Sequence, residues 1–345
     1  MREATTQRIK EVLPIKNADN IELVKVLGWE CVVKKGEFQA GDLCIYFEID
    51  SLLPISPEFE FLRKGCHKTL PDGTQGFVLK TIKLRKQISQ GLCMPLDILK
   101  EDFENDPLTT GLWEEFKKEA LVEGVDVSGV LDVTHYEKPV PACLAGSTKG
   151  RFPSFLRKTD ETRVQSEPEM LEKIQGKPYY ITTKLDGTSA TYYKKDGELG
   201  ACSRNLEKKY FSENQYWRMA EKYKLAECLP EGYCIQGEIV GPGIQKNSLM
   251  LKEIDLYIFN MYKIEGLEKT GFHELNGFCF LNKIKMVPLE EIDLSFNYTQ
   301  EDLLKKAQGL YKNSDKKKEG IVVRSNDCQI SFKVLNNSYL LGEES

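Results

Sequence analysis

The first hundred residues alternate short apolar runs with turn-forming residues. Runs rich in Val, Ile, Leu and Phe cover residues 21–33, 43–49 and 77–86. Turn residues separate them at Lys35-Gly36, Ala40-Gly41-Asp42 and Pro71-Asp72-Gly73. Closely spaced short strands of this kind indicate a small β-barrel. One amphipathic helix is expected after the barrel, at residues 112–121, where Thr109 or Thr110 would cap it.

Beyond residue 140, the hydrophobic pattern has the period of β-strands in some stretches and that of α-helices in others. Strand-like runs cover 179–184, 188–194, 233–239, 254–263, 320–324 and 330–335, and helical periodicity covers 212–229 and 299–311. Thr299 precedes Glu301 and Asp302, an order that is typical of a helix N-terminus. Strands and helices that alternate without a βαβ rhythm predict an α+β fold with antiparallel sheets.

Residues 134–166 connect the two regions. Pro139, Pro141 and Gly146 break any regular period there, but Phe155 and Leu156 require burial, so the segment is not a free linker. We expect a domain boundary near residue 140, with one domain over 1–140 and another over 141–345.

Composition excludes several classes of protein. There are ten cysteines but no Cys-x-x-Cys pair, and only three histidines, so no zinc-site spacing is present. The cysteines are typical of reduced thiols. No apolar run approaches the roughly 18–20 residues that cross a bilayer, and residues 1–10 do not resemble a signal peptide. We expect a soluble intracellular protein, cytoplasmic or nuclear, without a membrane partner.

Net charge is −5, which by itself argues against a nucleic-acid partner. Basic residues nevertheless gather locally, which can create a positive face on an acidic protein. One group is Lys80, Lys83, Arg85 and Lys86; a second is Lys149, Arg151, Arg157, Lys158 and Arg163. If 77–86 is one strand, Lys83 and Arg85 point to one side and Lys80 and Lys86 to the other. Ordinary solvated faces remain the alternative for either group.

The strongest chemical signal is Lys184-Leu185-Asp186-Gly187. Alone it is weak, because a surface lysine before a β-turn gives the same letters. Its weight comes from the motifs that follow in order. These are Ser203-Arg204-Asn205, Gly237-Glu238, Tyr257-Ile258-Phe259-Asn260, Glu319-Gly320-Ile321-Val322-Val323 and Ser331-Phe332-Lys333.

This ordered set resembles the covalent nucleotidyltransferase superfamily of DNA ligases, RNA ligases and mRNA capping enzymes. The stretch from Lys184 through Thr188 and Ser189, with Ser203-Arg204-Asn205, looks most like the RNA ligases. The segment 158–165 resembles the one that precedes the nucleophile in RNA ligases with an N-terminal OB domain. The resemblance implies an OB-type nucleic-acid-binding domain over 1–140 and an ATP-grasp-like ligase domain over 141–345.

The resemblance also implies roles for individual residues. Lys184 would attack the α-phosphorus of ATP, and because a free lysine has a pKa of about 10.4, burial or a nearby cation must hold it neutral. Mg²⁺ or Mn²⁺ would be held through water by Asp186, Glu238 and Glu319. Lys333 would stabilise charge on the α-phosphate. Nucleotide contacts are expected from Lys184, Glu238, Glu319 and Lys333 and from Arg163, Gln165, Ser189, Arg204 and the adenine-stacking Phe259.

One departure concerns the end of the set, where the family often has Lys-x-Lys and this chain has Lys333-Val334-Leu335. DNA ligases and capping enzymes place an OB domain after the last motif, whereas the extra residues here lie in front. That order favours an RNA ligase over a DNA ligase or a capping guanylyltransferase. A non-catalytic RNA-binding relative is a further alternative, but it would not need the nucleophile.

The expected protein is therefore an ATP-dependent RNA ligase of the RNA-repair type. It would join a 3′-OH to a 5′-phosphate through lysyl-AMP and 5′-adenylylated RNA, with nicked duplex RNA as substrate. We expect it to act as a monomer.

Overall fold

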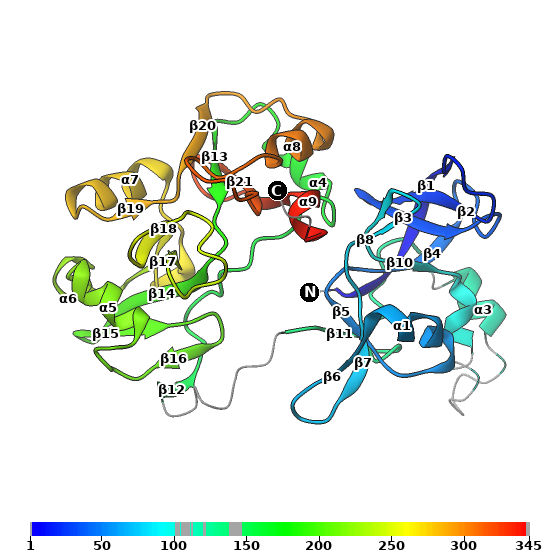
Figure 1. Cartoon of the computed structure of the whole chain (residues 1–345), viewed down its shortest axis with the longest axis horizontal. Helices are drawn as coiled ribbons and strands as arrows, with labels where there is room; N and C mark the ends of the chain where they lie inside the picture. The colour runs from blue at the N-terminus through cyan, green and yellow to red at the C-terminus, as the bar shows by residue number, and fades with distance from the viewer. Residues whose placement is uncertain are drawn as a thin grey trace. The chain divides into compact units, whose positions relative to one another are not determined.

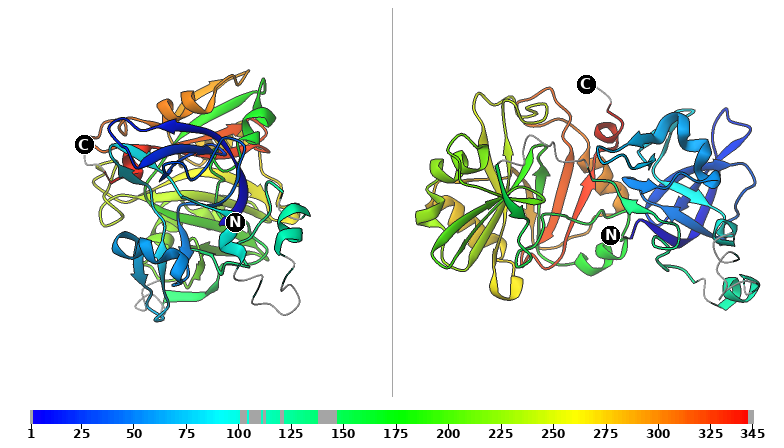
Figure 2. Two further views of the ribbon diagram at one scale, coloured as in Figure 1. Left: turned by 90° about the vertical axis from the view of Figure 1, so that its right-hand side faces the viewer. Right: turned by 90° about the horizontal axis from the view of Figure 1, so that it is seen from below.

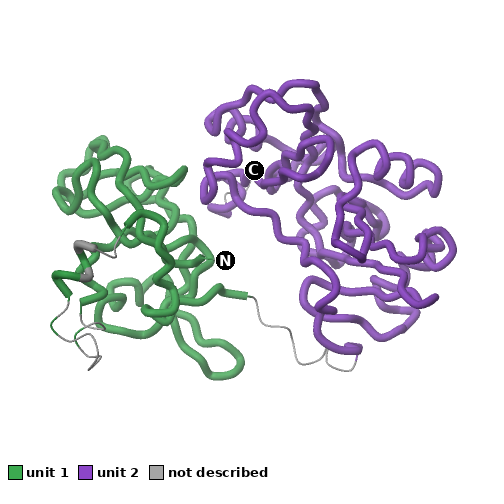
Figure 3. Tube along the Cα trace, turned by 180° about the vertical axis from the view of Figure 1, so that it is seen from behind, with its two compact units in different colours: residues 1–140 green, residues 141–345 purple. Residues whose placement is uncertain are grey.

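The computed structural model describes residues 2–100, 104, 111, 113–119, 122–137 and 147–342. The chain forms two compact units, residues 1–140 and residues 141–345 (Figure 3). The proposed helix caps Thr109 and Thr110 lie outside the described residues. The helix itself is α3, Trp113–Glu119, within the range that the sequence predicts.

Unit 1 is a β-barrel with short helices at its ends (Figure 1). A five-stranded sheet has the order β10-β4-β1-β2-β3 and a four-stranded sheet the order β11-β5-β7-β6. The strands of the first are β1 Ala4–Pro14, β2 Ile21–Val26, β3 Trp29–Lys34, β4 Leu43–Phe47 and β10 Leu92–Met94. Those of the second are β5 Ser51–Leu53, β6 His67–Thr69, β7 Gln75–Val78 and β11 Thr134–His135. The separate hairpin pairs β8 Ile82–Leu84 with β9 Gln87–Ser89, and the short helices are η1 Pro57–Leu62, α1 Arg63–Cys66 and η2 Leu96–Leu99.

The core of unit 1 collects inward-facing residues from both sheets. Ile45 and Phe47 alternate along β4, Leu53 and Phe77 come from the second sheet, and Trp113 adds the face of α3. Alternate residues of a strand share a face, and Cys44 and Tyr46, on the other face of β4, are buried as well.

Two strand predictions in unit 1 need correction. Residues 21–33 form a hairpin rather than one strand, because Leu27 adopts a positive φ of 52° between β2 and β3. The run 77–86 also divides: β7 ends at Val78 and β8 begins at Ile82. Arg85 and Lys86 are turn residues with φ of 50° and 72°, so the alternation proposed for the four basic residues is wrong.

Strand β1 was not anticipated because its sequence is polar. Thr5, Thr6 and Gln7 are nevertheless buried. Their polar groups are satisfied inside the barrel; for example, the Gln7 side-chain amide donates to Thr5 Oγ1 at 3.0 Å. A hydropathy pattern does not register strands whose buried side chains are hydrogen-bonded.

Unit 2 contains two antiparallel-rich sheets (Figure 2). The seven-stranded sheet has the order β12-β16-β15-β14-β17-β18-β19 and the four-stranded sheet the order β20-β13-β21-β22. The first contains β12 Thr148–Arg151, β14 Thr188–Lys195, β15 Glu198–Cys202, β16 Leu206–Lys208, β17 Tyr233–Val240, β18 Asp255–Lys263 and β19 Lys285–Met286. The second contains β13 Tyr179–Lys184, β20 Leu289–Asp293, β21 Gly320–Ser325 and β22 Ser331–Leu335.

Helices cover one face of each sheet in unit 2. Helices α5 Gln215–Lys222, α6 Leu225–Cys228 and α7 Phe272–Leu281 pack on the seven-stranded sheet. Helices α4 Glu169–Ile174 and α8 Gln300–Ala307 pack on the four-stranded sheet. The remaining elements are the short η4 Glu265–Leu267 and α9 Asn337–Leu340. The opposite face of each sheet is not covered by these helices, so side chains on that face can line a functional site.

Most elements of unit 2 agree with the sequence. Thr299 and Asp302 form the predicted cap of α8, with reciprocal side-chain to backbone hydrogen bonds. The helical run 212–229 divides into α5 and α6 because Lys224 adopts a positive φ of 51°. Helix α7 was missed. In the part of the chain that the structure describes, no helix is long and apolar enough to cross a membrane.

Candidate active site

Lys184 is the last residue of β13, where that strand leaves its partner β21. The pairs run from Tyr179 with Ser325 to Lys184 with Gly320. Because residues of a strand alternate between faces, Lys184 shares the face of Thr182, opposite the face that packs on α4 and α8. Its side chain is 26% exposed, so the ammonium is held by protein but remains reachable from solvent.

The turn after Lys184 requires glycine for a steric reason. A Cβ atom at Gly187 would lie 2.4 Å from the backbone oxygen of Ile239 and 2.8 Å from Glu238 Cγ. The same holds at Gly320, where a Cβ atom would lie 2.1 Å from the oxygen of Val334. Close approach of backbones therefore explains the glycines in Lys-x-Asp-Gly and Glu-Gly, and it brings their charged neighbours together.

Three carboxylates surround the Lys184 ammonium. Glu319 Oε2 accepts from Lys184 Nζ at 2.8 Å. Burial alone would lower the pKa of Lys184, but the charges of Glu319, Glu238 and Asp186 outweigh it and raise that pKa. Burial alone therefore does not hold Lys184 neutral in the ligand-free protein, because the carboxylates keep its proton in place; of the two means considered above, a nearby cation is the one that remains.

The pKa of Glu238 is raised in this cluster. Burial raises the pKa of Glu238 to about 8; Lys184 opposes the rise, and the negative charges of Glu319 and Asp186 add to it. Burial and the charges of Glu319 and Asp186 also raise the pKa of Tyr339, in α9. Three acidic groups thus share one lysine, an arrangement that favours binding of an additional cation.

Tyr311 organises this cluster, and no sequence motif indicated it. Its hydroxyl donates to the Lys184 carbonyl at 3.0 Å and accepts from the backbone N–H groups of Asp186 and Glu319, each at 3.1 Å. A phenol has one donor and two acceptor positions, so this hydroxyl is fully used. Its ring is buried against Leu185. One side chain thereby bridges β13 and β21 where their ladder ends.

The cationic side of the site is formed by Lys333 and Arg163. Lys333 is a residue of β22, and its backbone forms an isolated β-bridge with the backbone of Arg163. Burial lowers the pKa of Lys333 to about 8, and the positive charges of Arg163 and Lys184 contribute to the lowering. Two neighbouring cations of this kind are suited to phosphate oxygens.

Gln165 follows on the same segment. It is 2% exposed, and its Oε1 atom finds no hydrogen-bond donor within the described residues. A buried acceptor without a donor costs about 1–3 kcal/mol. The energy is recovered when a ligand supplies an N–H group, so Gln165 is placed as a binding residue would be.

Arg204 lies in a different set of contacts. Its guanidinium pairs with Asp160 at 2.8 Å, and neighbouring Asn205 accepts from Lys158 Nζ at 3.0 Å. These contacts tie Arg204 to the segment 158–165. None of the described contacts joins Arg204 directly to Lys184, so the structure does not bring it into the central cluster.

Ser189 and Phe259 lie on the seven-stranded sheet. Ser189 pairs with Glu238 across β14 and β17, so both side chains leave the same face of the sheet. Phe259 is the extra residue of a bulge in β18. Its ring packs on the cluster that contains Tyr311, and the Arg324 guanidinium lies 5.8 Å from the ring centre. Arg324 is itself held by Glu161 at 3.0 Å.

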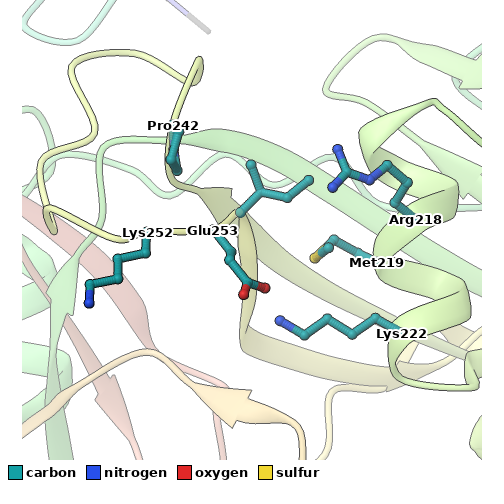
Figure 4. Close-up of a pocket in the computed structure, with 7 residues that line it drawn as sticks. Arg218, Met219, Lys222, Pro242, Lys252 and Glu253 are labelled. Carbon is teal, nitrogen blue, oxygen red and sulfur yellow. The ribbon is translucent and has the colours of Figure 1, made fainter.

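A cavity of about 410 Å³ lies elsewhere in unit 2, between α5 and the segment after β17 (Figure 4). None of the predicted site residues lines it. Its lining mixes Lys222, Lys252 and Arg218 with Glu253, so it has no single charge character. Among the residues that the structure describes, no three His, Cys, Asp or Glu side chains are arranged to hold a metal ion directly.

Comparisons with known proteins agree on one family. An OB-fold domain model matches residues 3–96, and an RNA ligase model matches residues 177–335. Among solved structures, a mutant of Naegleria gruberi RNA ligase with AMP and Mn is 34% identical, with a TM-score of 0.87 over 99% of this chain and 98% of that chain. The chain belongs to the RNA ligase family.

Two more structures of the Naegleria gruberi RNA ligase match in the same way. A mutant with ATP and Mn is 34% identical, with a TM-score of 0.86 over 98% of each chain. The complex with PPi is 35% identical, with a TM-score of 0.85 over 99% of this chain and 98% of that chain. No curated protein sequence matches.

Family membership confirms the α+β fold, with an N-terminal OB-fold domain followed by a ligase domain. It also confirms the prediction of an enzyme that forms phosphoric-ester bonds in RNA. The individual roles of the residues around Lys184 remain predictions, and the geometry described above is their physical basis.

Proposed function

We propose that this RNA ligase uses ATP to seal nicks in duplex RNA, with Lys184 as the nucleophile. The observation that carries the proposal is the cluster itself. Lys184 meets Glu319 at 2.8 Å, feels the charges of Glu238 and Asp186, and has Lys333 as a cationic neighbour. A merely structural lysine would not need three carboxylates and a second buried cation.

In the first step, Lys184 Nζ forms a bond to the α-phosphorus of ATP and the bond from that phosphorus to the β-phosphate oxygen breaks. Pyrophosphate leaves with the electron pair, and the lysine passes its proton to solvent, which reaches the partly exposed side chain. Lys333 and Arg163 are placed to stabilise the charge that gathers on the α-phosphate. The Naegleria structures carry ATP with Mn, AMP with Mn, and PPi, which are the substrate and the two parts expected of such a split.

Release of the lysine proton requires a change in the surrounding charge. Asp186, Glu238 and Glu319 would hold Mg²⁺ or Mn²⁺ through water, since the described residues offer no direct ligand set. When bound, the ion would neutralise these carboxylates and make the α-phosphorus more electrophilic. Burial, together with the charges of Glu319 and Asp186, raises the pKa of Glu238, and a cation bound beside these carboxylates would lower it again.

Adenine recognition is assigned to Gln165 and Phe259. The unpartnered Gln165 Oε1 suits the exocyclic amine of adenine, whereas guanine offers a carbonyl in its place. Phe259 would stack on the base while Arg324 supports the ring from a distance of 5.8 Å. Ser189 and Arg204 would contact the remaining nucleotide and the 5′-phosphate end.

In the later steps AMP moves from Lys184 to the RNA 5′-phosphate, and the 3′-OH then attacks that phosphate and releases AMP. The test is incubation of the purified protein with α-labelled ATP or GTP, followed by nicked duplexes of RNA or DNA. We expect covalent label from ATP only, located on Lys184, and sealing of the RNA duplex. Label from GTP, or sealing confined to DNA, would overturn the proposal.

A further inference from the structure

The hairpin β8–β9 of unit 1 stands apart from the two barrel sheets as a two-stranded sheet of its own. All residues from Ile82 to Lys86 are exposed. Hydrophobic packing therefore does not explain the hairpin, even though Ile82 and Leu84 are apolar and 43% and 39% exposed. A feature that packs little and still has a defined shape calls for another explanation.

The turn of this hairpin has an unusual composition. Leu84 pairs with Gln87, so Arg85 and Lys86 form a two-residue loop with φ of 50° and 72°. Such loops favour Asn-Gly or Asp-Gly, because both central residues need a positive φ. Within the described residues, this is the one place where two consecutive non-glycine residues both have positive φ. Two cations are thus kept where two smaller residues would be more stable.

The hairpin is also a local concentration of positive charge. Between Asp72 and Asp97 the sequence contains no acidic residue, but it contains Lys80 and Lys83 in addition to the turn cations. Arg85 and Lys86 form no ion pair with any described residue. The overall charge of −5 therefore does not represent this surface.

The base of the hairpin is fixed to the barrel. Val32 N donates to Ser89 Oγ at 3.0 Å, Gln90 N donates to the Glu30 carbonyl at 2.8 Å, and Gln87 Nε2 donates to the Glu30 carboxylate at 2.9 Å. These bonds hold β9 against β3. The cationic tip is therefore presented in a set position, which lowers the entropy lost on binding.

We infer that the tip Arg85-Lys86 of hairpin β8–β9 binds the phosphate backbone of duplex RNA. The residues 79–90 include no aromatic side chain on which an unpaired base could stack. Proteins that bind single strands rely on such stacking, whereas duplex RNA is recognised through its shape and its phosphates. The inference rests on the proposed function for the identity of the substrate, and it assigns to unit 1 a contact that lies outside the catalytic cluster.

The test replaces Arg85 with Asn and Lys86 with Gly in one variant, which removes both cations and installs a favoured turn. In a Lys184→Ala background, which prevents catalysis, binding of a nicked RNA duplex is measured over a series of salt concentrations. We expect affinity to fall about 10-fold and the slope of log K against log salt to decrease in magnitude by about 2. The melting temperature should equal or exceed that of the parent, because the turn strain is relieved.

The matched control is Lys34→Gln with Lys35→Gln, which removes two exposed cations from the end of β3 and the turn after it, in the same unit. If this control weakens binding equally, the effect is one of total charge and the inference is wrong. Unchanged affinity and salt slope in the hairpin variant would also overturn it, as would an equal loss of single-stranded RNA binding.

Lysine labelling separates this inference from the proposed function. The rate of label transfer from ATP is measured for the hairpin variant with Lys184 intact. A loss of labelling as large as the loss of RNA binding would assign the tip to the nucleotide and overturn the inference. If the parent protein accepts no label while the hairpin variant still loses duplex binding, the proposed catalytic step fails and the hairpin surface stands.

Discussion

Lys184 and Arg85 are both cations near the end of a β-strand, but the surroundings of their side chains are opposite in character. The Lys184 ammonium is enclosed by three carboxylates, with the nearest oxygen at 2.8 Å. The Arg85 guanidinium is exposed in a turn and forms no ion pair with the described residues. The carboxylates around Lys184 control the protonation of its ammonium group and hold its Nζ atom in position, as nucleophilic chemistry requires. The exposed position of Arg85 leaves its charge available to a large partner.

A second comparison concerns two turns of the same type. Hairpin β14–β15 uses Asp196-Gly197, with φ of 55° and 80°, which are residues that such a turn favours. Hairpin β8–β9 uses Arg85-Lys86 at nearly the same angles. The backbone geometry alone does not require the basic pair, so the turn itself does not explain why Arg85 and Lys86 occupy it.

The largest effect is expected from Lys184→Ala. If the enclosed lysine is the nucleophile, covalent labelling by ATP should be abolished, because no other group would take the AMP. Sealing of a nick that already carries a 5′-adenylate should persist, since that step does not need the amine. Labelling and sealing are followed in parallel on denaturing gels. Label that survives in the variant would place the nucleophile elsewhere.

The next largest effect is expected from removing one carboxylate of the cluster. Asp186→Ala, Glu238→Ala or Glu319→Ala should each slow labelling by roughly 10²-fold or more, because electrostatic stabilisation of the transition state is lost. Thermal unfolding provides the control. A variant that loses stability but keeps its specific labelling rate would show that its carboxylate is only structural.

An intermediate effect is expected from Tyr311→Phe. The change removes one hydroxyl and leaves the Lys184 carbonyl and the N–H groups of Asp186 and Glu319 without their partner. We expect the labelling rate at saturating ATP to fall roughly 10- to 100-fold, because small displacements of reacting groups are costly. The KM for ATP should change much less.

Tyr192→Phe is the matched control for that variant. Tyr192 is fully buried in the same unit, and its hydroxyl donates to the Tyr216 carbonyl at 2.8 Å. Its loss should cost about 1 kcal/mol of stability without slowing the chemistry. If both variants lose stability alike and label at the parental rate, Tyr311 has no positioning role.

The smallest effect on activity is expected from Asp255→Asn. Asp255 is buried between Lys222 at 2.9 Å and Lys285 at 2.6 Å. Burial would raise its pKa, but hydrogen bonds from Lys285, Tyr223 and Lys222 outweigh it and lower that pKa to about 2. The Asp255→Asn variant therefore tests whether a cluster of charged side chains that lies away from Lys184 contributes to catalysis.

A depressed carboxyl pKa stabilises the folded state above the unfolded pKa of about 3.9, and that contribution is lost as the pH falls through about 2. Asp255→Asn should therefore cost roughly 1–3 kcal/mol at neutral pH, with a difference from the parent that shrinks below pH 4. Urea unfolding at several pH values measures it. A large loss of labelling with parental stability would contradict a purely structural role.

The sequence predicted the strands of the candidate site well because their signals are local. Strand β13 was placed at 179–184 in full agreement with the structure, since apolar and β-branched residues end at Asp186-Gly187. Tyr311 could not be found in this way. Its contribution depends on three backbone groups that lie 8 to 127 positions away along the chain. A pattern of residue types does not predict such contacts.

The errors in unit 1 have a different origin. Strand β1 is polar in sequence and buried in structure, so hydropathy gave no signal for it. The run 77–86 contains no glycine or proline after Phe77 to mark its turn, and Arg85 and Lys86 adopt positive φ without a residue type that announces it. Rules based on turn residues fail where residues that the turn disfavours occupy it.

The Tyr311 hydroxyl has a consequence for motions of the ligand-free enzyme. The amides of Asp186 and Glu319 donate to the same oxygen atom, although Asp186 follows β13 and Glu319 precedes β21. Any opening that withdraws the tyrosine exposes both protons to solvent in one event. In deuterium-exchange measurements the two amides should therefore share one protection factor, and a difference between them would show that the strands separate by another route.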